Sequence, residues 1–134
     1  MTKHKSSEKQ VVRKMSDILE IKHTSRVIYA RLSDNSKAFI RYRVENGVMK
    51  LIETYTPPQH RGKGIAKKLM QYAIELAKKN NWLIEPICSY SVYYFIKYPE
   101  YRELLVPEYR KMSDEELKEL FKKRLEEEKK KDKD

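Results

Sequence analysis

The chain has 134 residues, close to the commonest size of a single domain, so one hydrophobic core is expected. Its longest uninterrupted apolar run, residues 92–96, is far shorter than the ~20 residues that span a bilayer, and no apolar leader follows Met1. The single cysteine excludes an internal disulfide. A membrane-spanning helix and a disulfide-stapled secreted fold are thereby excluded, and we expect a cytoplasmic protein without a membrane partner.

The net charge of +10 is unevenly distributed along the chain. Residues 1–16 contain five basic residues and one acidic residue, residues 17–110 contain sixteen and ten, and residues 111–134 contain nine of each. The basic excess therefore lies in an N-terminal arm and in the middle of the chain. Such a charge distribution favours anionic partners, either a phosphorylated small molecule or a nucleic acid.

The residue pattern divides the chain into three parts. Residues 1–16 are polar, basic and without periodicity, which is typical of a flexible arm. Residues 17–110 hold the apolar segments of a folded domain. Residues 111–134 begin near a capping box, Ser113-Asp-Glu-Glu, and form a charged helix whose last turns, from Glu126, are expected to fray.

Three strands in an antiparallel meander are predicted at the start of the domain. Residues 26–32, 38–44 and 48–56 are rich in β-branched and aromatic side chains. Asn46-Gly47 between the last two strands is the signature of a type I′ hairpin turn. Pro57-Pro58 ends the third strand.

Helical spacing of apolar residues predicts a helix over residues 65–79, with Asn80-Asn81 as a left-handed stop. A fourth strand follows at residues 82–88, where Pro86 indicates an irregularity or a sheet edge. Residues 91–98 form a short helix that ends at Pro99. Together these elements predict an α+β (or α/β) domain built on one sheet.

The segment between the third strand and the long helix is the candidate site. Two glycines, Gly62 and Gly64, precede a helix start whose backbone N–H groups have no helical partner, an arrangement that binds anions. Lys63, Lys67 and Lys68 lie where the helix dipole disfavours cations, so a bound anion would compensate them. The glycine spacing fits neither a Walker P-loop nor a dinucleotide fingerprint.

The spacing Arg61-x-x-Gly64-x-Ala66 matches the acetyl-CoA diphosphate loop of the GNAT acetyltransferase superfamily. With Cys88, Tyr94 and residues 98–101 in matching order, residues 26–105 resemble a short single-domain branch of N-acetyltransferases. The resemblance implies a GNAT-like sheet and cofactor helix, acetyl-CoA (coenzyme A) as the donor, and an amine of unknown identity as the acceptor.

The resemblance also implies the residues that bind the donor. Backbone amides of residues 62–66 would hold the diphosphate, Arg61 would steady the loop, and Lys63 or Lys67 would reach a phosphate. The main chain of Tyr55 and Thr56 would bind the pantetheine arm like an added strand. The implied cofactor-binding residues are Tyr55, Thr56, Arg61, Gly62, Lys63, Gly64, Ile65, Ala66 and Lys67.

Three residues are catalytic candidates. Cys88 matches a recurrent cysteine beside the acetyl group, where it either accepts acetyl or lines the pocket. Tyr94 matches the tyrosine that protonates the departing thiolate. Many relatives have an acid where this chain has Tyr55, so Glu53, on the same strand face, is the substitute base.

Two rival functions stay open at this point: a non-catalytic acyl-CoA-binding module and a basic nucleic-acid-binding protein, the latter without an aromatic RNA-binding signature. No metal-ligand spacing links the histidines with Cys88. The arm and the C-terminal helix lie outside the resemblance, so we expect them to be dispensable for cofactor binding. Either a monomer or a homodimer fits the sequence.

Overall fold

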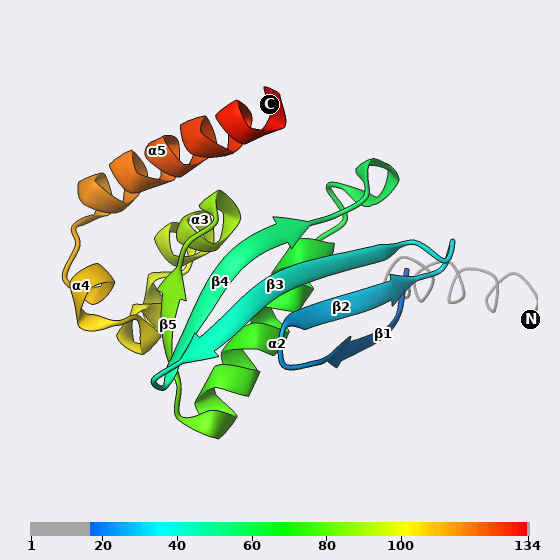
Figure 1. The fold of residues 1–134 in the computed structure, drawn as a ribbon, viewed down its shortest axis with the longest axis horizontal. Helices are drawn as coiled ribbons and strands as arrows, with labels where there is room; N and C mark the ends of the chain where they lie inside the picture. Colours follow the sequence, from blue (N-terminus) through cyan, green and yellow to red (C-terminus); the bar gives the residue numbers. More distant parts are fainter. Residues whose placement is uncertain (1–16, 134) are drawn as a thin grey trace, which may run out of the picture.

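The computed structural model describes residues 17–133, so the predicted arm at residues 1–16 lies outside the described part of the chain. A five-stranded sheet forms its centre, and the strands follow chain order across it (Figure 1). The first four strands pair antiparallel and the last pairs parallel with the fourth. The strands are β1 (Ile18–His23), β2 (Val27–Leu32), β3 (Lys37–Glu45), β4 (Val48–Tyr55) and β5 (Leu83–Pro86).

The meander has one strand more than the three that the sequence predicted. The apolar residues Ile18 and Ile21 of β1 are three positions apart in the sequence, and the register of β1 against β2 shifts between Ile18 and Glu20. A strand is recognised in sequence by a period of two, and this irregularity removes that signal. The predicted hairpin turn is confirmed, since Asn46 and Gly47 both have positive φ, 51° and 74°.

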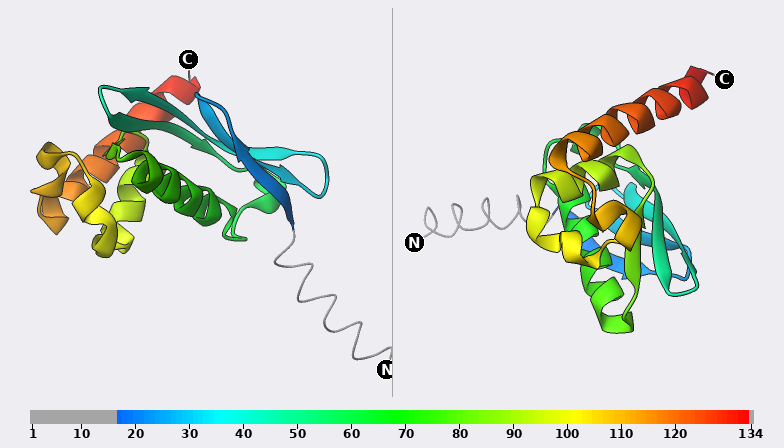
Figure 2. Two further views of the ribbon diagram at one scale, coloured as in Figure 1. Left: turned by 90° about the horizontal axis from the view of Figure 1, so that it is seen from below. Right: turned by 90° about the vertical axis from the view of Figure 1, so that its left-hand side faces the viewer.

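One long helix, α2 (Ile65–Asn80), lies across one face of the sheet (Figure 2). Its apolar stripe is buried against the sheet and forms one side of the core between helix and sheet. The buried residues of the stripe are Ile65, Leu69, Met70, Ala73, Ile74 and Ala77. The helix ends with Asn81 in the left-handed region, as the Asn80-Asn81 pair predicted.

The remaining helices gather beyond β5. They are α3 (Ser89–Lys97), α4 (Pro107–Arg110) and α5 (Asp114–Lys133), with a 3-10 turn at Pro99–Leu104. A second 3-10 turn, Pro58–His60, lies between β4 and α2. Helix α3 begins two residues earlier than predicted. Helix α5 opens with the predicted capping box, in which Glu116 N donates to Ser113 Oγ at 3.1 Å and Ser113 N donates to Glu116 Oε1 at 2.9 Å.

Helix α5 packs along α3 and reaches toward the end of β4 (Figure 1). Leu117 is fully buried, and the ring of Phe121 lies 5.8 Å from that of Tyr93 on α3. The helix extends to Lys133 and so includes the last turns, from Glu126, in which the sequence predicts fraying. Because it is held by α3, α5 stays helical where its charged sequence alone would not.

Strand β4 contains a bulge that decides which side chains reach the site. Arg41 of β3 pairs with Glu53 while Tyr42 pairs with Leu51, so Ile52 is an extra residue in β4. Without it, strict alternation from the buried Leu51 would turn Glu53 toward the core. With it, Thr54 points to the α2 side, and Glu53 points to the opposite face.

The sheet opens at the end of β4. Strand β5 pairs with β4 only between Val48 and Leu51. The amides of Ile87 and Cys88 then both donate to the carbonyl of Leu51, at 3.0 Å each, and the chain turns into α3. Strand β5 is the edge strand that Pro86 predicted, and β4 continues to Tyr55 beside a gap.

Candidate active site

The loop between β4 and α2 has the backbone geometry of an anion site. Gly62 and Gly64 have φ values of 81° and 79°, which β-carbon-bearing residues adopt only at a cost. Gly64 is the N-cap of α2 and brings no side chain to cap the helix. The first amides of α2 therefore have no side-chain cap, and the first turn contains no acidic residue.

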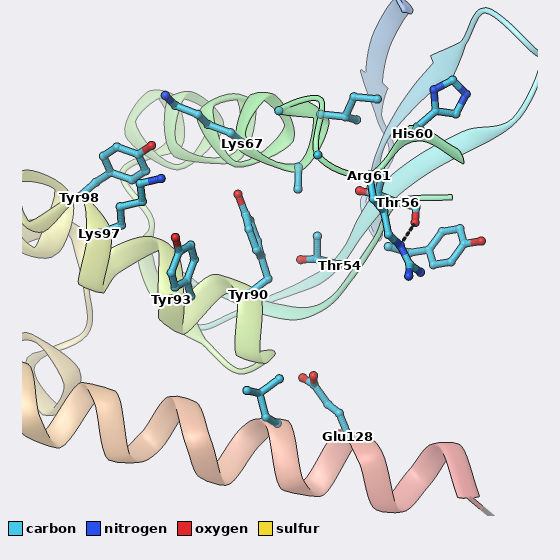
Figure 3. Close-up of a pocket in the computed structure, with 16 residues that line it drawn as sticks. Thr54, Thr56, His60, Arg61, Lys67, Tyr90, Tyr93, Lys97, Tyr98 and Glu128 are labelled. Carbon is cyan, nitrogen blue, oxygen red and sulfur yellow. Dashed lines mark hydrogen bonds between the residues drawn. The ribbon is translucent and has the colours of Figure 1, made fainter. Parts of the chain in front are cut away.

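Arg61 ties this loop to the end of β4. Its Nε donates to the carbonyl oxygen of Thr56 at 3.0 Å, and its side chain lies across the strand end (Figure 3). The position agrees with the steadying role expected from the sequence.

Lys63 points away from the loop. Its Nζ lies 3.3 Å from Asp17 Oδ2 and 3.4 Å from His60 Nδ1, and it does not line the cavity described below. His60 is itself buried, with Nε2 3.0 Å from Asp34 Oδ2. Hydrogen bonds from Ser36 and Gln59 hold the pKa of Asp34 well below its usual range.

A cavity of about 720 Å³ opens between the glycine loop, the end of β4, α3 and α5. Figure 3 shows side chains from all four elements facing it. It is larger than the volume of a single small anion and falls in the range of ligand pockets. Its lining residues include Thr54, Tyr55, Thr56, Arg61, Gly62, Gly64, Ile65, Ala66, Lys67, Tyr90, Tyr98, Leu125 and Glu128.

Two lysines and a tyrosine form one wall of this cavity. Nζ of Lys67 lies 5.2 Å from the ring centroid of Tyr98, and Nζ of Lys97 lies 5.7 Å from it. Both ammonium groups border the cavity, one from α2 and one from α3 (Figure 3). The sequence predicted Lys67 as a site residue but missed Lys97 and Tyr98.

A second cavity, of about 470 Å³, lies on the other side of the β4 end. It shares Thr54, Tyr55, Arg61, Tyr90 and Glu128 with the first cavity, so the two meet at this point. Its own residues bring in the charged and nucleophilic groups. They are Arg41, Ile52, Glu53, Cys88, Ser89 and Lys131.

Cys88 lies at the floor of the second cavity, 5% exposed, at the turn from β5 into α3. Its Sγ is 3.3 Å from Thr54 Oγ1 and 3.3 Å from Ser91 Oγ. Thr54 borders both cavities, so its side chain separates the Cys88 thiol from the first cavity. The described residues contain no group of three or more metal-ligating side chains around it.

Glu53 lies on the outer face of the sheet with Tyr55, as the sequence predicted. Its Oε1 accepts a hydrogen bond from Arg41 Nε at 2.8 Å, and both side chains are about half exposed. The carboxylate lines the second cavity beside this guanidinium.

Tyr94 is placed in the core and not at either cavity. It is 1% exposed, and its ring lies 4.7 Å from that of Tyr98 and 5.8 Å from that of Phe95. Burial, with the nearby Tyr101 and Tyr98, raises its pKa to about 12.

Tyr90, four residues earlier, is the tyrosine that lines both cavities (Figure 3). Burial is the main cause that raises its pKa to about 12, with smaller contributions from neighbouring tyrosines. Tyr90 lies two residues after Cys88, in the first turn of α3. The sequence did not identify it, because the resemblance pointed to Tyr94.

Glu128 of α5 borders both cavities on the side of that helix. Its Oε2 accepts from Ser89 N at 2.8 Å and its Oε1 from Ser89 Oγ at 2.6 Å. The carboxylate thus lies at the N-terminus of α3, where the helix dipole favours a negative charge. With Leu125 it makes α5 part of the cavity wall, a role that no local pattern in the charged helix indicates.

A comparison with models of known protein families identifies the family of this chain. The family model described as GCN5-related N-acetyltransferase matches residues 27–104, which is more than half of the chain. The chain belongs to the GCN5-related N-acetyltransferase family. This GCN5-related protein is therefore an N-acetyltransferase by family, and acyl transfer is its chemistry. Its matched residues run from β2 to the turn before α4, so β1 and α5 lie outside the match.

A solved structure supports the same fold. The solution structure of a GCN5-like protein from Staphylococcus aureus is 29% identical in sequence and superposes with a TM-score of 0.51. The likeness covers 66% of this chain and 88% of that one. In residues 17–133 of the GCN5-related chain, no helix combines the length and the hydropathy needed to cross a membrane.

Proposed function

We propose that this protein transfers the acetyl group of acetyl-CoA to the amine of a small acceptor. The observation that carries the proposal is the pair of cavities that meet at Thr54 and Tyr90. The first begins at the glycine loop and suits a phosphorylated donor. The second brings an acceptor to the same point from the other side of β4.

The donor cavity supports this assignment in three ways. The free amides at the start of α2 and the left-handed glycines suit the diphosphate. Lys67 and Lys97, which flank Tyr98, suit the further phosphate at the adenosine end. The part of β4 beyond Leu51 has no β5 partner, so its main chain is available to the amide groups of the pantetheine arm.

The chemical step needs an unprotonated amine and a proton donor. The amine nitrogen forms a bond to the acetyl carbonyl carbon, the carbon–sulfur bond breaks, and the CoA thiolate takes up a proton. We assign the proton donor to Tyr90 in place of Tyr94, because Tyr90 borders both cavities and its pKa of about 12 keeps it protonated at neutral pH.

The proton lost by the amine needs an acceptor, and Glu53 is our candidate. It lines the second cavity, and its Oε1 accepts a hydrogen bond from Arg41 Nε. Positioning the two substrates at the junction of the cavities would supply a large part of the rate.

Cys88 offers a second route, in which the thiol takes the acetyl group as a thioester and passes it on. We propose direct transfer instead, with Cys88 as part of the acceptor wall. Its Sγ lies 3.3 Å from the hydroxyl oxygens of Thr54 and Ser91, and neither hydroxyl is a base that would take up the thiol proton.

Calorimetry with acetyl-CoA on the full chain tests the proposal first, with one site in the micromolar range expected. Intact-mass measurement after incubation with acetyl-CoA then separates the two routes. Wild type without a stable 42 Da adduct, and a Cys88→Ala variant that keeps most of its turnover, support direct transfer. Binding without turnover on any amine would indicate a non-catalytic acyl-CoA-binding module, and no binding would overturn the assignment.

A further inference from the structure

The charges around the second cavity identify the class of acceptor. The argument rests on the proposed function, since it takes this cavity as the acceptor side. Five charged side chains line it: Arg41, Glu53, Arg61, Glu128 and Lys131. The two carboxylates and three cations come from β3, β4, the glycine loop and α5.

Both carboxylates are already compensated by groups of the protein. Glu53 pairs with Arg41 at 2.8 Å. Both oxygens of Glu128 accept hydrogen bonds from Ser89, at the positive end of α3. Neither carboxylate is left to attract a second cationic group of an acceptor.

The two remaining cations are Arg61 and Lys131. Arg61 uses its Nε on the carbonyl of Thr56, which is neutral, so its full positive charge faces the cavity. Lys131 lies on the last part of α5 on the same wall as Glu128. The cavity therefore carries a net positive charge, in keeping with the basic excess of residues 17–110.

We infer that the acceptor is a small amine that also carries a carboxylate or phosphate group, bound with that group between Arg61 and Lys131. Polycationic acceptors such as polyamines or lysine-rich peptides would bring like charge into this cavity and are disfavoured. The same positive surroundings favour the neutral form of the bound amine, which is the form that attacks the thioester.

Matched pairs of small amines test the inference with the full chain and acetyl-CoA. One arm compares phosphoethanolamine with ethanolamine, a second compares β-alanine with propylamine, and putrescine serves as the dicationic probe. Product is measured by mass and free CoA by thiol release. We expect kcat/KM at least about ten-fold higher for the anionic member, equivalent to about 1.4 kcal/mol, and a preference that weakens as salt is added. The two arms distinguish a phosphate from a carboxylate.

A charge-reversal pair on α5 provides the matched control. Lys131→Glu is expected to remove most of the preference for the anionic amine and to leave the Kd of acetyl-CoA unchanged. Lys130→Glu, an exposed neighbour that does not line the cavity, is expected to keep the preference.

The outcomes separate this inference from the proposed function. Faster turnover of putrescine, ethanolamine or propylamine than of the amines with an anionic group overturns the acceptor class, as does turnover of no member by a protein that binds acetyl-CoA. An unchanged preference in Lys131→Glu also overturns it. Absence of acetyl-CoA binding in calorimetry instead overturns the proposed function itself.

Discussion

Gly64 and Gly47 have nearly the same backbone conformation in very different surroundings. Their φ values are 79° and 74°, and a β-carbon built on either meets no atom within 4 Å. Gly47 lies in the β3–β4 turn, whereas Gly64 is the N-cap of α2 beside the donor cavity. Substitution at either site has the same intrinsic backbone cost, and only Gly64 has a proposed ligand to obstruct.

We expect Gly64→Val and Gly47→Val each to lower the free energy of unfolding by about 1–2 kcal/mol or somewhat more, because a branched residue is strained at positive φ. Only Gly64→Val should also lose acetyl-CoA binding, since its side chain would block the approach of the diphosphate. Urea unfolding and calorimetry on both variants measure the two effects. Equal acetyl-CoA affinity in the two variants would contradict the diphosphate site.

Tyr90 and Tyr94 allow the proton donor to be tested by two equally conservative changes. Tyr90→Phe removes a hydroxyl from the cavity and should lower kcat about 10- to 100-fold with little change in the Kd of acetyl-CoA. Tyr94→Phe removes a hydroxyl from the aromatic core and should leave kcat within about two-fold.

The pH profile gives an independent readout of the same assignment. A general acid must be protonated, and the raised pKa of Tyr90, about 12, means that its proton is lost only well above neutral pH. The acceptor amine must be unprotonated, so kcat/KM of wild type should rise with pH and not fall again below about pH 10. A falling limb below pH 10 that disappears in Tyr90→Phe would count against this account.

At the scale of elements, α5 forms part of the cavity wall although it lies outside the region that matches the family model. Its cavity-lining side chains, Leu125 and Glu128, are separated from the matched family region by α4 and a turn. The sequence predicts that residues 111–134 are dispensable for binding, whereas the position of these two side chains leads us to expect the opposite. Removal of α5 should weaken acetyl-CoA binding and expose the buried Leu117 side of the core.

Glu128→Gln tests the contact that anchors α5, with less disturbance than truncation. The amide keeps one acceptor but loses the charge at the N-terminus of α3, so the free energy of unfolding should fall by about 0.5–2 kcal/mol. Glu126→Gln, an exposed position two residues away, should change it by less than about 0.5 kcal/mol. Equal effects of the two changes in urea unfolding would mean that the Ser89 contact does not hold the helix.

Elements set by local pattern were predictable from the sequence. The Asn46-Gly47 turn, α2 with its apolar stripe, and the capping box of α5 each depend on residues within about four positions of one another. Elements set by distant partners were not. The bulge at Ile52 depends on the register with β3, and the contact between Glu128 and Ser89 joins residues 39 apart.

The residues of the candidate site were also predictable only where a local pattern identifies them. The loop from Arg61 to Ala66 was found because its glycines and lysines are adjacent in sequence. Tyr90 was passed over for Tyr94, because which turn of α3 faces the cavity depends on how the helix packs against α5 and the end of β4. A short helix of nine residues with four aromatic side chains has no single apolar stripe from which that choice can be made.

At the scale of the whole molecule, the last part of β4 is paired on one side only, because its pairing with β5 ends at Leu51. A strand end with pairing on one side only opens locally more often than the sheet centre, so its amides exchange with solvent faster. If the donor lies along this edge, it supplies the missing neighbour, and the ligand becomes a structural part of the sheet. The free energy of local opening then rises by about 2.7 kcal/mol at a hundred-fold excess over Kd.

Hydrogen exchange therefore reports on binding at this edge. Amides of residues 52–56 that point away from β3 should exchange about a hundred-fold more slowly with acetyl-CoA at that excess. Amides of the β1–β2 pair, far from the cavities, should be unchanged. Uniform slowing over the sheet would instead mean that the ligand stabilises the fold as a whole. Slowing confined to residues 52–56 would mean that the active edge becomes rigid only while a donor is bound.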